Sequence, residues 1–201
     1  MHISEGVLSG PVLLSGAALA AAGTAVGLKH LDYERIAQAG VLSAAFFVAS
    51  LIHVPIGPSS VHLVLNGIVG LLLGWSAFPA ILVALVLQAL FFQFGGITTL
   101  GVNTVIMALP AVLCYLLFGR MSRKKTAPAL FAAFACGFLS LFLAAVLVGV
   151  ALIFTEERFL GVSGLVVMVN LPVMIIEGII TSFCVAFLRK VHPVMLAGSS
   201  R

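Results

Sequence analysis

A histidine directly after the amino-terminal residue gives this chain the means to chelate a metal ion with its own backbone. The chain begins MHISEG. The Met1 amine, the His2 backbone nitrogen and the His2 imidazole can close two fused rings on one ion. Such a nitrogen set tends towards square-planar coordination, which suits Ni(II) or Cu(II) better than Zn(II) or oxygen-seeking cations. One coordination position then remains for a donor from elsewhere in the chain.

His62, which opens the apolar segment VHLVLNGIVG, is a candidate for that position. On a helix His62 and Asn66 share one face, since they are four residues apart. His53 and Ser60 lie in the preceding connection, HVPIGPSS, whose prolines and glycine predict a turn. We expect these neighbours to surround the site. The alternative is a histidine that is solvated or hydrogen-bonded at an interface.

A second polar stretch interrupts the apolar sequence in the middle of the chain. Gln88 and Gln93 lead into the glycine-containing loop 94–101, and Asn103 follows it. Irregular backbone at membrane depth is tolerated only where protein or a water-filled cavity covers it. We therefore expect this loop, together with Asn103, to line or close the metal site. The alternative is an ordinary glycine-rich turn.

Glu177 is the acidic residue of the last apolar segment. A carboxylate within a membrane span is a candidate functional group, and it can equally pair with a neighbour to fix helix packing. We expect a role beside the metal ligands or in packing more than direct ligation. The cysteines Cys114, Cys136 and Cys184 lie in apolar runs without a CxxC spacing, so we interpret them as packing residues.

Composition identifies the class of the chain. Of its 201 residues, 62% are hydrophobic and 8% are charged, and the mean hydropathy is +1.28. Such a chain has too much apolar surface for water, so we interpret it as an all-α polytopic membrane protein. Spans of about 20 residues use up the length, which predicts a single integral membrane domain over residues 1–201. The predicted spans number about seven: 11–28, 36–52, 61–74, 77–94, 102–118, 127–153 and 161–188.

The basic residues predict the orientation of these spans. With the N-terminus outside, the lysine and arginine clusters at 29–35, 120–125 and 189–201 fall in cytoplasmic segments, and only Arg158 lies outside. This orientation places the C-terminus in the cytoplasm and the candidate histidines at the external face of the cell (inner) membrane. The net charge of +4 is therefore a signal of topology and does not indicate nucleic-acid binding. The start of the chain lacks the basic region of a secretory signal, so we expect it to stay uncleaved.

Four motifs together resemble one transporter family. They are MHISEG at the start, then SSVHLVLNG, then LFFQFGGITTLGVNTVIMALPA, and IIEGIITSF near the end, in this order over most of the chain. The sequence resembles the cobalt/nickel substrate-binding membrane component of energy-coupling-factor ABC transporters, the CbiM/NikM family. It departs from many relatives in reading Pro-Ser-Ser-Val ahead of His62, where they have Gly-Thr-Ser-Gly.

The resemblance implies a site, a substrate and partners. It implies that Ni²⁺ or Co²⁺, as the transported substrate and not a cofactor, is held by the Met1 amine, the His2 amide nitrogen and imidazole, and His62. It also implies a transmembrane coupling subunit, two cytoplasmic ATPases and often a small accessory membrane protein. The chain itself contains no GxxxxGK(S/T) phosphate loop. We therefore expect ATP hydrolysis in the partners, and a transport subunit, not an enzyme, in this chain.

Other functions fit parts of the sequence. A vitamin-capturing component of the same transporter class needs an external pocket lined by aromatic and polar groups, whereas this chain has one Trp and two Tyr. The GVSG run around Ser163 suggests an intramembrane serine protease, which needs a histidine base within hydrogen-bond reach. The only later histidine, His192, follows about 28 residues of helix at 1.5 Å each, roughly 40 Å away. An ion channel is disfavoured because no ring-forming acidic or carbonyl-filter motif occurs.

Overall fold

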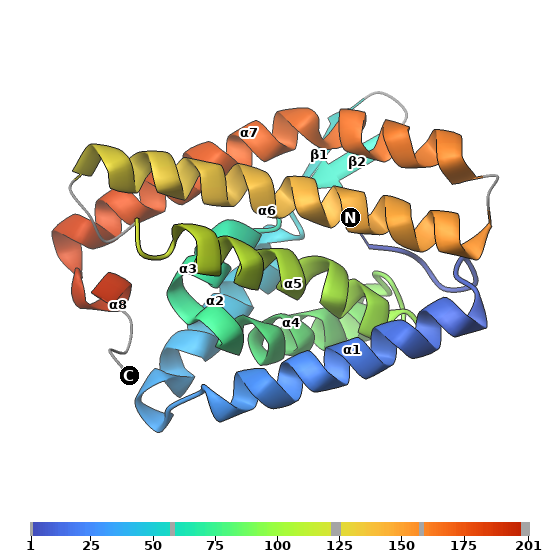
Figure 1. Ribbon diagram of the computed structural model, residues 1–201, viewed down its shortest axis with the longest axis horizontal. Coiled ribbons are helices and arrows are strands. Elements are labelled where there is room, and N and C mark those ends of the chain that lie inside the picture. The colour runs from blue at the N-terminus through green and yellow to red at the C-terminus, as the bar shows by residue number, and fades with distance from the viewer. Residues whose placement is uncertain (1, 57–58, 122–125, 157–158, 198–201) are drawn as a thin grey trace.

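The fold is a bundle of apolar helices with one short β-hairpin (Figure 1). The computed structural model describes residues 2–56, 59–121, 126–156 and 159–197. The longer helices are α1 (Gly10–Lys29), α2 (Ile36–Ala49), α4 (Ala77–Phe92), α5 (Leu100–Phe118), α6 (Thr126–Thr155) and α7 (Leu160–Val191). The shorter elements are η1 (Tyr33–Arg35), β1 (His53–Ile56), β2 (Ser59–His62), α3 (Asn66–Leu73), η2 (Gly74–Ser76) and α8 (Val194–Ala197).

Five helical stretches of the described chain are long and apolar enough to cross a membrane. They are Gly10–Lys29, Asn66–Phe92, Leu100–Phe118, Thr126–Thr155 and Ser163–Val191. A transmembrane helix needs about 20 predominantly apolar residues. The fold is therefore that of a multi-pass membrane protein, as the composition predicts. The predicted count of about seven spans is not confirmed, and the side of the membrane on which each terminus lies stays a prediction.

Two of the predicted spans fold differently from expectation. The span predicted at 36–52 becomes α2, with 14 residues, and the span predicted at 61–74 becomes the end of β2 followed by α3, with 8. His62 is thus the last residue of a strand and Asn66 the first residue of a helix. The prediction that they share one helical face is therefore wrong. Leu65, with φ of 60°, takes the left-handed conformation and separates the two elements.

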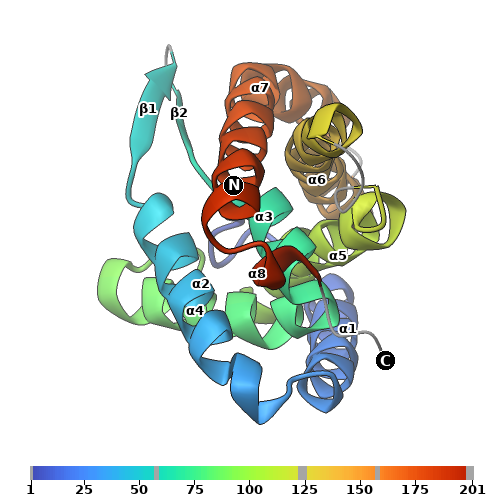
Figure 2. The ribbon, with the colours of Figure 1, turned by 90° about the vertical axis from the view of Figure 1, so that its left-hand side faces the viewer.

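The connection around His53 is a β-hairpin. Strands β1 and β2 are antiparallel, with His53 opposite His62. Figure 2 shows the hairpin projecting from the bundle beside α7. The turn predicted at Gly57 and Pro58 falls on residues outside the described ones. The hairpin therefore delivers His62 from the edge of the bundle to the start of α3.

Helix α3 lies at the centre of the bundle, and all eight of its residues are buried. Its main neighbours are α5 and α6, with α7 next to its start. Glycines permit this approach: a Cβ on Gly67 would lie 2.5 Å from Gly137 Cα of α6, and one on Gly70 would overlap with the Ala111 carbonyl of α5. Small residues let helix backbones approach closely within membranes in the same way. The packing of α3 therefore carries the end of β2, and His62 with it, into the interior.

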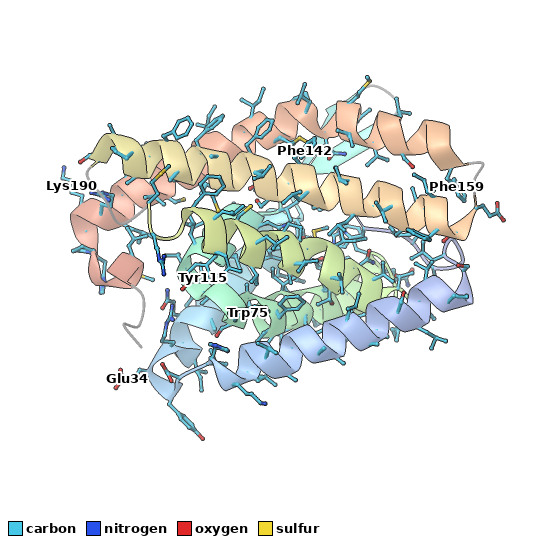
Figure 3. All side chains as sticks on the ribbon, in the orientation of Figure 1. Glu34, Trp75, Tyr115, Phe142, Phe159 and Lys190 are labelled. Atoms are coloured by element: carbon cyan, nitrogen blue, oxygen red, sulfur yellow. The ribbon has the colours of Figure 1, made fainter. Side chains whose placement is uncertain are left out.

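The basic residues of the described part of the chain lie at one end of the bundle. Figure 3 shows Glu34 and Lys190 at this end and Phe159 at the other. Helix α5 also ends there and α6 begins there (Figure 1). The segments that carry the basic residues at 29–35, 120 and 189–190 thus meet at one end of the molecule. This is the arrangement that the predicted orientation requires.

Candidate metal site

The rings of His2 and His62 stack on each other inside the fold. Their centroids are 5.0 Å apart and their planes are 18° from parallel. The ring of Phe94 lies 6.3 Å from that of His2, at an angle of 27°. His62 is only 7% exposed. The structure thus brings together two of the three predicted donor residues, while Met1 is outside the described residues.

The ring of His62 is oriented by the next residue of its own backbone. His62 Nδ1 lies 3.1 Å from the Leu63 carbonyl oxygen. In the tautomer with the proton on Nδ1, this contact is a hydrogen bond, and Nε2 carries the lone pair that a metal ion needs. Metal-binding histidines commonly donate their second N–H to a carbonyl or carboxylate in this way. The geometry therefore suits ligation through His62 Nε2.

Asn103 holds the main chain of the N-terminal segment. The Ile3 N–H donates to Asn103 Oδ1 at 3.0 Å, and Asn103 Nδ2 donates to the Ile3 carbonyl at 3.1 Å. A further bond from Asn103 Nδ2 to Thr99 Oγ1, at 3.2 Å, fixes this amide at the start of α5. Both Asn103 and Ile3 are buried. Two hydrogen bonds to the residue after His2 thus determine where His2 lies.

The loop between α4 and α5 receives Glu5, a contact that sequence reasoning missed. The Glu5 N–H donates to the Gly95 carbonyl at 3.0 Å, and Glu5 Oε1 accepts from the Thr98 N–H at 3.1 Å. Gly95 and Gly96 have φ of 79° and 129°, which favour glycine. A Cβ at Gly96 would also overlap with the Glu5 side chain. The glycines of this loop are therefore needed for the N-terminal segment to dock.

Glu177 reaches from α7 to the chain just after His62. Its Oε1 atom accepts hydrogen bonds from the N–H groups of Val64 and Leu65, the second at 2.8 Å. The side chain is 1% exposed. The carboxylate is therefore bound to backbone within three residues of His62, in a position to support that histidine.

The structure also places the other residues predicted to surround the site, namely Asn66, His53 and Ser60. Asn66 is buried at the start of α3, and its Nδ2 lies 3.7 Å from Met107 Sδ. His53 is paired with His62, and Ser60 lies on the same strand as His62, but the side chains of His53 and Ser60 are outside those described. Within the described part of the chain, no three His, Cys, Asp or Glu side chains gather into a metal site. A site at His2 and His62 must therefore recruit other donors, such as the amine and amide nitrogens of the predicted chelate.

Ser163, of the GVSG run, is a packing residue of α7. Its Oγ donates to the Phe159 carbonyl at 2.9 Å and also lies 3.3 Å from the Gly149 carbonyl of α6. His192 follows the last residue of this 32-residue helix, whereas Ser163 lies in its first turn. At about 1.5 Å per residue the helix holds the two side chains far apart. They cannot act together as nucleophile and base, so the pair that the serine protease alternative names does not form.

Replacing Asn103 with leucine should loosen the N-terminal segment. Asn103→Leu keeps a side chain of similar size but leaves the buried N–H and carbonyl of Ile3 without partners. We expect Ni²⁺ to bind about 10- to 100-fold more weakly, the usual range for a lost contact that supports a ligand. Calorimetric titration measures this change. The control Gln38→Leu removes an amide near the start of α2 and should bind Ni²⁺ with the original affinity. An unaltered affinity in Asn103→Leu would show that Asn103 does not position His2.

A bundle of apolar helices that brings the half-buried His2 against the buried His62 defines a multi-pass membrane protein with a candidate metal site. Residues 2–195 match the family model CbiM, described as the cobalt uptake substrate-specific transmembrane region. The match covers nearly the whole chain, and the chain belongs to this family. The resemblance that the four sequence motifs indicate is thereby confirmed.

The relatives are transport proteins. The chain is 44% identical over 196 residues to a Haemophilus influenzae protein provisionally named a metal transport protein, covering 96% of this chain and 95% of that one. It is 30% identical over 205 residues to an Archaeoglobus fulgidus protein provisionally named a fused nickel transport protein, covering 96% of this chain and 67% of that one. A crystal structure of a truncated transition metal transporter superposes with a TM-score of 0.83 at 25% identity, covering 96% of this chain and all of that one. The chain is therefore a substrate-binding membrane component for cobalt or nickel uptake, and a transporter in class.

Proposed function

We propose that this chain captures Ni²⁺ or Co²⁺ at the external face of the membrane for uptake by an energy-coupling-factor ABC transporter. The proposed donors are the Met1 amine, the His2 amide nitrogen and imidazole, and the His62 imidazole. The observation that carries the proposal is the stack of the His2 and His62 rings inside the fold. Membership of the cobalt uptake family supports the substrate class.

The stacked rings are within reach of one ion. An imidazole nitrogen lies about 2.0–2.1 Å from a bound Zn²⁺, which gives the scale for such ligands. The His62 ring is held by the Leu63 carbonyl, so only the His2 ring, whose centroid lies 5.0 Å away, needs to turn about its side-chain bonds to direct a nitrogen at an ion on His62 Nε2. The hydrogen bonds of Asn103 to Ile3 hold the next residue in place, so His2 is delivered without a large ordering cost.

The donor set predicts the selectivity and the pH response of the site. Four in-plane nitrogens favour Ni(II), Co(II) or Cu(II) and reject Mg(II) and Ca(II), which prefer oxygen ligands. Each donor must lose its proton to bind, and the free pKa values are near 8 for an α-amino group and near 6.5 for an imidazole. Protons therefore compete with the metal, and its affinity falls as the external pH falls.

The vitamin-capture alternative has less support. The groove between α1, α5 and α6 is lined by apolar side chains with a single hydroxyl, that of Ser15. A binding site for an organic ligand normally adds several convergent polar groups to its apolar walls. This groove therefore does not have the character of a vitamin site.

Energy for uptake must come from partners. We propose the partners that the family resemblance implies: a transmembrane coupling subunit, two cytoplasmic ATPases and a small accessory membrane protein, assembled in the inner membrane. The end of the bundle that holds Glu34 and Lys190 (Figure 3) is the proposed cytoplasmic face. Docking of the coupling subunit at that end would leave the opposite end of the bundle uncovered.

Calorimetric titration of the purified full chain with four ions tests the proposed substrate. We expect Ni²⁺ and Co²⁺ each to bind tightly with a stoichiometry near one, and Mg²⁺ and Ca²⁺ to give no saturable heat, because the donors are nitrogens. Binding of Ni²⁺ in competition with Co²⁺ would show that they share one site. Equal binding of Mg²⁺ and Ni²⁺, or no binding of either transition metal, would contradict the proposed function.

A further inference from the structure

Glu177 is connected to His62 through a single peptide group. Glu177 Oε1 accepts the N–H of Val64, and the carbonyl oxygen of that same peptide, contributed by Leu63, lies 3.1 Å from His62 Nδ1. The peptide bonds of the described chain are all trans, so this N–H and C=O point in opposite directions. The carboxylate and the imidazole therefore hold one peptide from its two sides.

The backbone N–H groups just after His62 need a hydrogen-bond acceptor. β2 ends at His62 and α3 begins at Asn66, so the N–H groups of Val64 and Leu65 lie outside the strand and at the start of a helix. The first N–H groups of a helix have no partner within it, and an unsatisfied N–H is strongly unfavourable inside a membrane. Glu177 Oε1 satisfies both of them, the second at 2.8 Å.

Close packing keeps Glu177 in this place. A Cβ on Gly137 of α6 would lie 2.6 Å from the Glu177 carbonyl oxygen, and one on Gly67 of α3 would lie 2.5 Å from Gly137 Cα. The backbones of α3, α6 and α7 are thus in direct contact around the junction after His62. The carboxylate and this junction are held as one unit, because α7 cannot shift here without displacing α3.

We propose that Glu177 is the positioning residue of His62 and acts through the peptide between Leu63 and Val64. By accepting the Val64 N–H it fixes the plane of that peptide and strengthens its carbonyl as an acceptor. The carbonyl in turn holds the Nδ1 proton of His62, which directs the Nε2 lone pair to the ion. The arrangement is a longer equivalent of the carboxylate–histidine pairs that orient metal ligands. The inference rests on the proposed function and adds to it the group that sets the orientation of His62.

Two substitutions separate the reach of this side chain from its charge. Glu177→Gln keeps the length and one acceptor oxygen but removes the charge, whereas Glu177→Asp keeps the charge and draws the oxygens back by one methylene. Positioning predicts that Glu177→Gln binds Ni²⁺ within about fivefold of the original chain, since a neutral acceptor is only moderately weaker. Glu177→Asp should bind about 10- to 100-fold more weakly, as expected for a lost supporting contact. Titration of the full chain with Ni²⁺ measures both.

A double-substitution cycle with His62→Ala shows whether Glu177 acts through His62. If it does, Glu177→Asp should weaken Ni²⁺ binding in the original chain but by less than about twofold in the His62→Ala chain, because coupled sites are not additive. A general loss of structure would weaken both chains alike. Thr181→Val is the matched control: Thr181 is fully buried one turn further along α7, and its replacement should leave the affinity unchanged.

Three results would overturn the inference. Glu177→Asp could bind as the original chain does, Glu177→Gln could lose as much affinity as Glu177→Asp or more, or the effect of Glu177→Asp could persist in full without His62. Each of these would show that Glu177 acts by charge or by general stability. Failure of the proposed function looks different, because His62→Ala alone would then leave Ni²⁺ binding unchanged.

Discussion

Three glycines added ahead of Met1 should weaken Ni²⁺ binding by about a thousandfold or more. The extension moves the amine away from His2, and with it goes the ring that joins the amine to the His2 amide nitrogen. Structural metal sites gain ~10–16 kcal/mol from about four donors, so the loss of one donor and its chelate ring removes about 4 kcal/mol or more. Three residues are used because a shorter extension would itself form a new amine-to-histidine chelate.

The control for this experiment carries the same three glycines after Arg201. Calorimetric titration of both chains, in the same detergent, compares an altered start with an altered end. The control should bind as the original chain does. If the chain extended at its start also bound Ni²⁺ with unaltered affinity, the amine would not be a ligand, and the site would have to be built from side chains alone.

Replacing His62 with alanine has the second largest expected effect, a loss of about a hundredfold in Ni²⁺ affinity. His62 supplies one of four donors, worth about 3 kcal/mol in a site of this kind. The fold itself should tolerate the change, because His62 ends a strand and the junction after it is held by Glu177. Titration measures the affinity, and thermal unfolding without metal measures whether the fold is unchanged.

His30→Ala provides the comparison for this substitution. His30 follows the last residue of α1, where its Nδ1 bonds to the Val26 carbonyl and its ring stacks on Trp75. It is therefore a histidine with an aromatic neighbour that lies outside the proposed site, and its loss should leave Ni²⁺ binding as it is. A drop of equal size in both variants would assign the effect of His62→Ala to a general disturbance of the fold.

The long helices of this fold can be predicted from the sequence, because a continuous apolar run of about 20 residues has few other structures available in a membrane. The spans predicted at 102–118 and 127–153 correspond to Leu100–Phe118 and Thr126–Thr155. The run at 61–74 is different, since a short apolar run fits a buried strand and a helix equally well. Its structure depends on the hydrogen bonds of Glu177, a residue more than a hundred positions away. No local pattern contains that information.

The residues of the candidate site could likewise be predicted from the sequence only in part. The chemistry of an amine next to a histidine nominates His2, and polarity within an apolar context nominates His62, Asn103 and Glu177. Glu5 escapes such reasoning, because a glutamate near the start of a chain usually faces solvent. Its hydrogen bond to Thr98 joins two segments that are far apart in the sequence and share no sequence pattern. The adjacent Gly95 and Gly96 are the one signal in the sequence, since a Gly-Gly pair often marks backbone that another segment approaches closely.

X-ray absorption at the nickel edge of the Ni²⁺-loaded full chain can show the proposed chelate itself, because it reports the type, number and geometry of the ligands. We expect four nitrogen donors in a square plane, with the His62 imidazole lost from the spectrum of His62→Ala. Six-coordinate nickel bound mainly by oxygen, or a spectrum unchanged by His62→Ala, would contradict a chelate formed by the start of the chain and completed by His62.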